Sequence, residues 1–318
     1  MMQQSSFLPR RGQPACRPGR RLQAGRTLME SMISLAIGAV LTGAVLLTVS
    51  GSGMSGRRLD AQASLNEQGR IAVNQLAADL RMAGYWQPTS EVLSVDTTPG
   101  GLPMVFGCVE GFVAADAAWA ALACASGADA GSGTGGAVAV RYEAGDAGTA
   151  MALDCGGQDV RTAGLDMIED RFFVRAPGAD APGLYCQPTT GGDPILLVEG
   201  VERMVLRYGL SPVAVNPLVN RAFDAPVLEG RTSRYWAASA LDRSCGAGTM
   251  PANSWCAVTA VDVCLLLRTP DGVSDAPAVP YLDCDNEMRT VADRRLRSAA
   301  RTTVTLRNRA SAVFGGAT

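Results

Sequence analysis

An uncharged segment near the N-terminus constrains this chain more than any other feature. The 19 residues from Ser31 to Val49 contain no charged side chain, and Glu30 stands directly before them. As a helix rising about 1.5 Å per residue, the segment would be roughly 28 Å long, enough to cross the hydrocarbon core of a bilayer. A carboxylate beside such a segment costs free energy in lipid, so Glu30 is a candidate functional residue.

The first 25 residues are basic. They contain no Asp or Glu and five arginines, namely Arg10, Arg11, Arg17, Arg20 and Arg21. Positive charge before an apolar helix holds the N-terminus in the cytoplasm and predicts that the rest of the chain crosses the membrane. A plain membrane anchor and a secretory signal peptide begin in the same way, and residues 50–53 could supply a signal-peptide cleavage site. The apolar run is, however, longer than the h-region of about 7–15 residues found in signal peptides.

Residues 59–86 are predicted to continue the helix beyond the membrane. Apolar or small residues recur there at steps of three and four: Leu65, Gly69, Val73, Leu76, Leu80 and Ala83. This spacing places them on one face of an amphipathic helix. Gly51, Gly53 and Gly56 each weaken a helix by about 1 kcal/mol relative to Ala, so a local melt or kink is expected near residues 50–56.

Beyond residue 87 the pattern is that of strands and long loops. Short apolar runs bounded by Gly, Pro and Asp predict strands at residues 137–142, 170–175, 195–198, 201–208, 258–268 and 302–307. In the longest run, four apolar residues alternate with other types, which makes one face apolar: Val261, Val263, Leu265 and Leu267. A short helix is expected around residues 114–124. The Arg-rich stretch 289–309 is expected to lie on the exposed face of the terminal strands.

Composition excludes several classes of function. The chain has no His and no Lys, so all 28 basic residues are Arg, and His-based catalytic triads and His-containing metal sites are excluded. Without the five arginines of residues 1–25, 23 Arg face 30 acidic residues, which gives a net charge of −7. A mildly acidic chain of this kind has no electrostatic pattern for binding nucleic acid. We expect no catalytic residue, no metal and no cofactor.

The cysteines indicate an oxidising compartment. Cys16 lies within the first 25 residues, and eight cysteines follow: Cys108, Cys124, Cys155, Cys186, Cys245, Cys256, Cys264 and Cys284. An even count in an exported chain predicts disulfides. The sequence contains no Cys-x2-Cys pair, which is the spacing that would indicate a zinc site. Sequence does not choose among the possible connectivities. Pairing of nearest neighbours (108–124, 155–186, 245–256 and 264–284) is expected, because each pair would close one loop between neighbouring strands.

Several strings resemble one family. The segment Asp79–Trp86, which reads Asp-Leu-Arg-Met-Ala-Gly-Tyr-Trp, is similar to a signature of the PilW family of minor type IV pilins. Asp293 to Arg297 and Thr302 to Arg309 are similar to later strings of the same family, behind a start that resembles a class III prepilin leader. The resemblance covers residues 25 to about 310. It implies an α+β fold, with a long N-terminal helix packed on an antiparallel β-rich globular domain.

The resemblance also implies domains, processing and assembly. The implied parts are a leader (residues 1–25), a transmembrane half-helix (26–58), an amphipathic half-helix (59–86) and a disulfide-bonded globular domain (87–318). Prepilin peptidase would cut between Gly25 and Arg26. The family usually has a Phe that is N-methylated after the cut, so Arg26 is a departure that affects methylation. Glu30 would pair with the N-terminal amine of an adjoining subunit.

The implied function is that of a minor pilin that primes pilus assembly and remains at or near the tip. Its partners would be other minor pilins, the major pilin, prepilin peptidase, inner-membrane lipid and a tip adhesin. It would sit in the inner membrane with the globular domain in the periplasm, then in the pilus, and would support activities such as twitching motility. Two alternatives stay open: a J-type pseudopilin of a type II secretion system, and a signal-peptide-cleaved periplasmic binding protein or enzyme.

Overall fold

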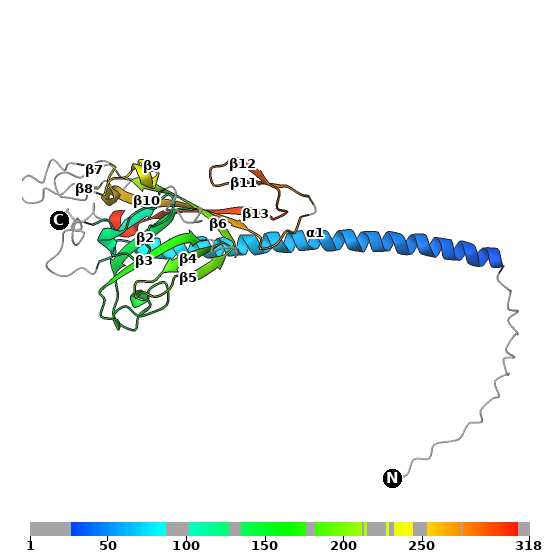
Figure 1. Ribbon diagram of the computed structural model, residues 1–318, viewed down its shortest axis with the longest axis horizontal. Helices are drawn as coiled ribbons and strands as arrows, with labels where there is room; N and C mark the ends of the chain where they lie inside the picture. The colour runs from blue at the N-terminus through cyan, green and yellow to red at the C-terminus, as the bar shows by residue number, and fades with distance from the viewer. Residues whose placement is uncertain are drawn as a thin grey trace, which may run out of the picture. The chain divides into compact units, whose positions relative to one another are not determined.

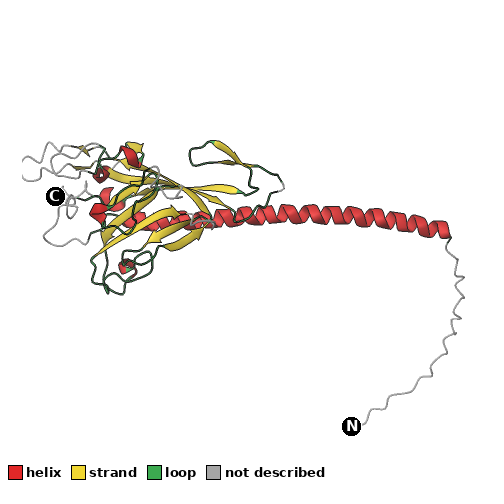
Figure 2. Cartoon of the chain, in the orientation of Figure 1, coloured by secondary structure: helices red, strands yellow, loops and turns green. Residues whose placement is uncertain are grey.

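The computed structural model describes residues 27–86, 102–126, 135–175, 182–211, 213–214, 227–228, 232–243, 253–274 and 276–310. The chain divides into two compact units, Met1–Ser55 and Gly56–Thr318. One helix, α1 (Leu28–Met82), contributes to both units. Figures 1 and 2 show this helix and the strands of the second unit.

The first unit contains the apolar part of α1. Its stretch Leu28–Thr48 has a mean hydropathy of 2.0 and no buried residue, and by length and composition it could cross a membrane. The helix is continuous through Gly51, Gly53 and Gly56, so the expected local melt is absent from α1. At the other end α1 stops at Met82, four residues before the predicted boundary, and Gly84 follows with a φ of 74°.

The second unit contains two main antiparallel sheets. The first has the order β1-β2-β3-β4-β5, formed by Val105–Cys108, Ala137–Glu143, Met167–Arg175, Gly183–Gln187 and Ile195–Glu199. The second has the order β13-β10-β6-β9, formed by Arg297–Thr305, Val258–Arg268, Val201–Leu210 and Arg234–Trp236. The expected α+β class is therefore confirmed.

Smaller elements complete the second unit. Two hairpins pair β11 (Val279–Leu282) with β12 (Met288–Val291) and β7 (Val213–Ala214) with β8 (Val227–Leu228). Short 3-10 turns lie at Trp119–Ala121, Ala150–Ala152, Ala238–Ala240 and Trp255–Ala257, and α2 (Arg307–Ala310) follows β13. The helix expected around residues 114–124 is only the single turn at Trp119–Ala121.

Gly200 joins the two main sheets. It is the single residue between β5 and β6, and its φ is 80°, a conformation that L side chains rarely adopt. A Cβ at this position would lie 2.7 Å from the Arg268 carbonyl oxygen. The chain therefore passes directly from one sheet into the other at a point where only Gly fits.

The core unites the end of α1 with both sheets. Leu65, Leu76 and Leu80 from the helix are buried in one cluster with Phe172 of β3 and Val263 of β10. In β10, the four residues Val261, Val263, Leu265 and Leu267 are all fully buried, so the predicted apolar face is the core face. Its opposite face also has apolar contacts, since Cys264, Leu266 and Cys284 form a separate small cluster.

Candidate functional site

The predicted assembly residue Glu30 lies in the first turn of α1. Its backbone N–H donates to the Thr27 carbonyl oxygen at 3.0 Å and to Thr27 Oγ1 at 3.3 Å, so Thr27 caps the helix. A carboxylate in the first helical turn also interacts favourably with the helix dipole. The Glu30 side chain is exposed and forms no ion pair with the described residues. Gly25 and Arg26 lie outside the described residues.

The segment of α1 that follows Glu30 is apolar and unburied. Leu35, Leu41 and Leu47 are each more than 60% exposed within the chain. Apolar surface of this extent requires lipid or other apolar helices around it. The segment therefore has the chemistry of a membrane anchor and of a helix-packing surface.

The later part of α1 packs tightly in the second unit. A Cβ on Gly69 would lie 2.9 Å from the Ala300 Cβ of β13, so Gly69 allows helix and strand to approach closely. Asn308 Nδ2 donates to the carbonyl oxygens of Arg81 and Met82, both at 3.2 Å, and so satisfies carbonyl groups at the helix end. The sequence Thr302–Arg309 thus holds the end of the helix as well as an edge of the sheet.

Two carboxylates are buried beneath this part of the helix. Burial and, to a smaller extent, the neighbouring Asp170 carboxylate together raise the pKa of Asp79 in α1 to about 7. Burial also raises the pKa of Asp170 in β3 to about 6, although Thr189 Oγ1 and the Cys155 N–H donate to its oxygens at 2.9 and 2.7 Å. Asp79 Oδ2 has no hydrogen-bond partner among the residues that the structure describes. Ionising Asp79 therefore costs free energy in the folded protein.

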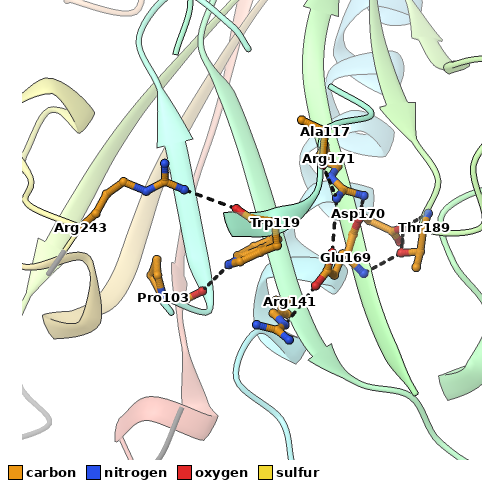
Figure 3. A network of polar contacts seen from close by, with 9 residues as sticks. All are labelled: Pro103, Ala117, Trp119, Arg141, Glu169, Asp170, Arg171, Thr189 and Arg243. Carbon is orange, nitrogen blue, oxygen red and sulfur yellow. Dashed lines mark hydrogen bonds and ion pairs between the residues drawn. The ribbon is translucent and has the colours of Figure 1, made fainter. Parts of the chain in front are cut away.

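A polar network fixes the loop around residues 117–122 to the first sheet (Figure 3). Glu169 in β3 forms ion pairs with Arg141 at 3.1 Å and with Arg171 at 3.4 Å. Arg171 Nη2 also donates to the Ala117 carbonyl oxygen at 3.1 Å, and burial lowers the pKa of this guanidinium. Trp119 Nε1 donates to the Pro103 carbonyl oxygen at 3.0 Å. The Glu169 carboxylate compensates the charge of both arginines, which indicates a structural role for the network, although Arg141 Nη1 and Arg171 Nε have no hydrogen-bond partner among the described residues.

Three of the expected disulfides are present: Cys108–Cys124, Cys155–Cys186 and Cys264–Cys284. Cys256 is also disulfide-bonded, whereas Cys245 lies outside the described residues, so the 245–256 pair stays a prediction. The sulfur atoms of Cys155 and Cys186 and the Asp170 carboxylate lie within 4.8 Å of one another. Because these sulfurs are bonded to each other, they are not thiolate ligands for a metal.

The Arg-rich stretch 289–309 does not lie wholly on an exposed face. The Arg297 side chain is only 2% exposed. Its Nε lies 2.7 Å from Glu202 Oε2, its Nη2 lies 2.7 Å from Asp293 Oδ2, and its guanidinium lies over the Tyr281 ring. The expectation of an exposed face is therefore wrong for Arg297, because two carboxylates from β6 and the preceding turn compensate its burial.

An unburied apolar helix segment with an acidic residue in its first turn, joined to a disulfide-bonded α+β unit, fits membrane anchoring. Residues 171–308, from within β3 to α2, match the family model of type IV pilus-assembly protein W, PilW. The resemblance to the PilW family is confirmed over this stretch, and it supports a pilus-related role.

Comparison with solved structures finds the type IV-like pilin TTHA1219 from Thermus thermophilus. The two chains are 13% identical, the match covers 77% of this chain and 98% of that chain, and the TM-score is 0.36. No curated protein matches the chain.

Two features of the site were not predicted from the sequence, namely the helix cap at Thr27 and the burial of Asp79. The helix cap is signalled by Thr27 standing three residues before Glu30, the spacing of a capping box. The burial of Asp79 has no such signal, because an acid on an amphipathic helix is normally expected on the solvent face. Its burial depends on which strands the helix meets.

Proposed function

We propose that this chain is a minor type IV pilin that helps to prime pilus assembly and enters the fibre at or near its tip. The match of residues 171–308 to the PilW family carries the proposal. It is supported by the apolar stretch Leu28–Thr48, which has the composition of a membrane span and is not buried by any of the described residues. The role is structural, and we assign no catalytic residue, metal or cofactor to it.

Glu30 is the assembly residue in this proposal. After prepilin peptidase cuts between Gly25 and Arg26, a new ammonium group lies four residues before Glu30 on its own chain. In lipid, an unpaired carboxylate is costly by about 2–3 kcal/mol or more on insertion scales. Pairing with the N-terminal amine of a neighbouring subunit removes that cost and brings the two helices into register. The exposed apolar faces, including Leu35 and Leu47, then pack in the fibre.

The decisive experiment separates assembly from folding. In a strain that lacks the gene, Glu30→Ala should give a folded, membrane-anchored protein that is cut normally. It should nevertheless reduce surface pili at least about tenfold, since each 1.4 kcal/mol lost in docking is a tenfold change. Sheared pili should contain little of the variant. Glu30→Asp should restore piliation only in part, because its side chain is shorter.

Asp60→Ala is the matched control, because Asp60 is an exposed acid on the same helix. It should give wild-type pilus numbers. Wild-type piliation in the Glu30→Ala strain would refute the docking role. A deletion strain with normal pili and a type II secretion defect would instead identify a pseudopilin.

Processing can be tested separately. Replacement of Gly25 by a bulky residue should leave a precursor that is about 2–3 kDa heavier in the inner membrane, because the leader contains 25 residues. N-terminal sequencing of the wild-type protein should begin at Arg26. A mature start at residues 51–54 would instead identify an ordinary signal peptide.

A further inference from the structure

Strand β5 ends the first sheet with an apolar edge. It pairs with β4 on one side, and no described residue pairs with its other side. The strand reads Ile-Leu-Leu-Val-Glu, and Ile195 and Leu196 are 39% and 40% exposed. An unpaired row of backbone N–H and C=O groups beside exposed apolar side chains is a template for another strand.

The other terminal strands of the two main sheets are protected. β1 is buried along its whole length. β9 has only three residues and begins with Arg234, and β13 carries the exposed Arg301. Short length, burial and positive charge are the usual ways in which proteins prevent strand addition. β5 has none of these, so its edge is suited to an interaction.

The charges around β5 define what could bind. Asp193 and Glu199 lie at the two ends of the apolar residues, both are exposed, and neither forms an ion pair with the described residues. Six residues separate the two acids, which corresponds to about 20 Å in an extended chain. The edge is therefore apolar in the middle and negative at both ends.

We propose that the outer edge of β5 binds an extended polypeptide strand that carries basic residues about six positions apart on either side of an apolar or β-branched run. Backbone hydrogen bonds would hold the strand in the sheet, and its basic ends would pair with Asp193 and Glu199. If the proposed pilus role is correct, the strand belongs to a neighbouring subunit. The binding reaction itself does not depend on that role.

A peptide tests the inference without a pilus. The segment Arg301–Arg307 of this chain, Arg-Thr-Thr-Val-Thr-Leu-Arg, has the required pattern and serves as the probe. Labelled peptide should bind saturably to the full chain in neutral detergent, and not to empty micelles, in a fluorescence-polarisation titration. A peptide with Glu at both ends should bind at least about tenfold more weakly, because both ends then repel the acids.

Variants of the chain locate the binding site. Leu196→Lys should weaken peptide binding about tenfold or more by protecting the edge, whereas Leu282→Lys, at a more exposed apolar position of β11, should not. The double variant Asp193→Lys with Glu199→Lys should reverse the preference and favour the Glu-ended peptide. Near-native circular dichroism and intact disulfides would confirm that these variants fold.

The backbone contribution is tested by N-methylation. A strand pairs through alternate residues, so methylating Thr302, Val304 and Leu306 should affect binding differently from methylating Thr303 and Thr305. One of these two peptides should lose binding and the other should keep it. Absence of saturable binding, equal binding of the Glu-ended peptide, or equal binding of both methylated peptides would overturn the proposal while leaving the Glu30 experiment unaffected.

Discussion

The two ends of helix α1 have opposite surroundings. Between Leu28 and Thr48 no residue is buried, whereas Leu65, Leu76 and Leu80 are at most 3% exposed. Both stretches are rich in apolar residues and share one continuous helix. The difference shows that hydrophobic content alone does not determine what a helix does. The later stretch stabilises the fold of its own domain, and the earlier one leaves its apolar side chains exposed.

The largest expected effect tests this contrast directly. Leu76→Ala should lower the free energy of unfolding of the second unit by about 2–5 kcal/mol, because it leaves a cavity in the core. Leu41→Ala, at a position that is 61% exposed, should leave that free energy unchanged. Denaturant unfolding of the full chain in detergent, followed by the fluorescence of the buried Trp119 and Trp255, measures both. Equal losses in the two variants would contradict the division of α1.

The next effect concerns the disulfides, which among the described residues lie in the second unit alone. The double variant Cys264→Ser with Cys284→Ser should lose about 3 kcal/mol, because an unfolded chain without this bridge has more conformations. The helical signal of the apolar stretch in detergent should persist. Alkylation under denaturing, non-reducing conditions should label no cysteine of the mature wild-type protein. Two or more labelled cysteines would show that pairing is incomplete.

The smallest effect depends on pH. The pKa of Asp79 is about 7 in the folded protein and 3.8 in its ordinary state, so the folded state binds a proton more tightly. The associated stability is fully present below pH 3.8 and is lost as the pH rises through about 7. Asp79→Asn should therefore raise the free energy of unfolding by about 1–3 kcal/mol at pH 8, and by roughly a third as much at pH 5, which lies inside the window between the two pKa values.

The pH effect has its own control. Asp60→Asn changes an exposed acid on the same helix and should not alter stability at either pH. The measurement is denaturant unfolding at pH 5 and pH 8, with the neighbouring Asp170, Asp154 and Tyr142 left unchanged. An Asp79→Asn variant that loses stability at pH 8 would show that the carboxylate has a favourable interaction there.

Sequence predicted the elements whose pattern is set by local chemistry. The strand expected at residues 258–268 is β10 with the same bounds, because apolar residues alternate from Val261 to Leu267 within a run rich in β-branched and apolar residues. The strands expected at 195–198 and 201–208 are β5 and β6, each extended by one or two residues. The disulfide pairs followed from closing short loops. For the strands the information lies within a few residues of chain, and the three disulfides that are present join cysteines 16 to 31 residues apart.

Features that depend on distant partners were not predictable. Strand β4 contains Gly183 and is stabilised by pairing with β3 and β5 rather than by its own pattern. The burial of Arg297 requires Glu202, which lies 95 residues earlier in the chain. The terminal strand was expected at residues 302–307 but occupies 297–305, because its register is set by β10. Pairing of this kind has no local signal.

The disulfide spacing has a mechanical consequence. Tension applied to the two ends of the domain can extend only those residues that lie outside the loops closed by disulfides. The bridge between Cys155 and Cys186 spans 31 residues, which would otherwise release up to about 100 Å of extended chain. Under a force strong enough to separate the strands of the sheets, the loop between Cys155 and Cys186 would not extend while the disulfide is intact. The extension of the domain under tension would therefore be shorter than the full length of its chain, because the residues inside the disulfide-closed loops would not contribute to it.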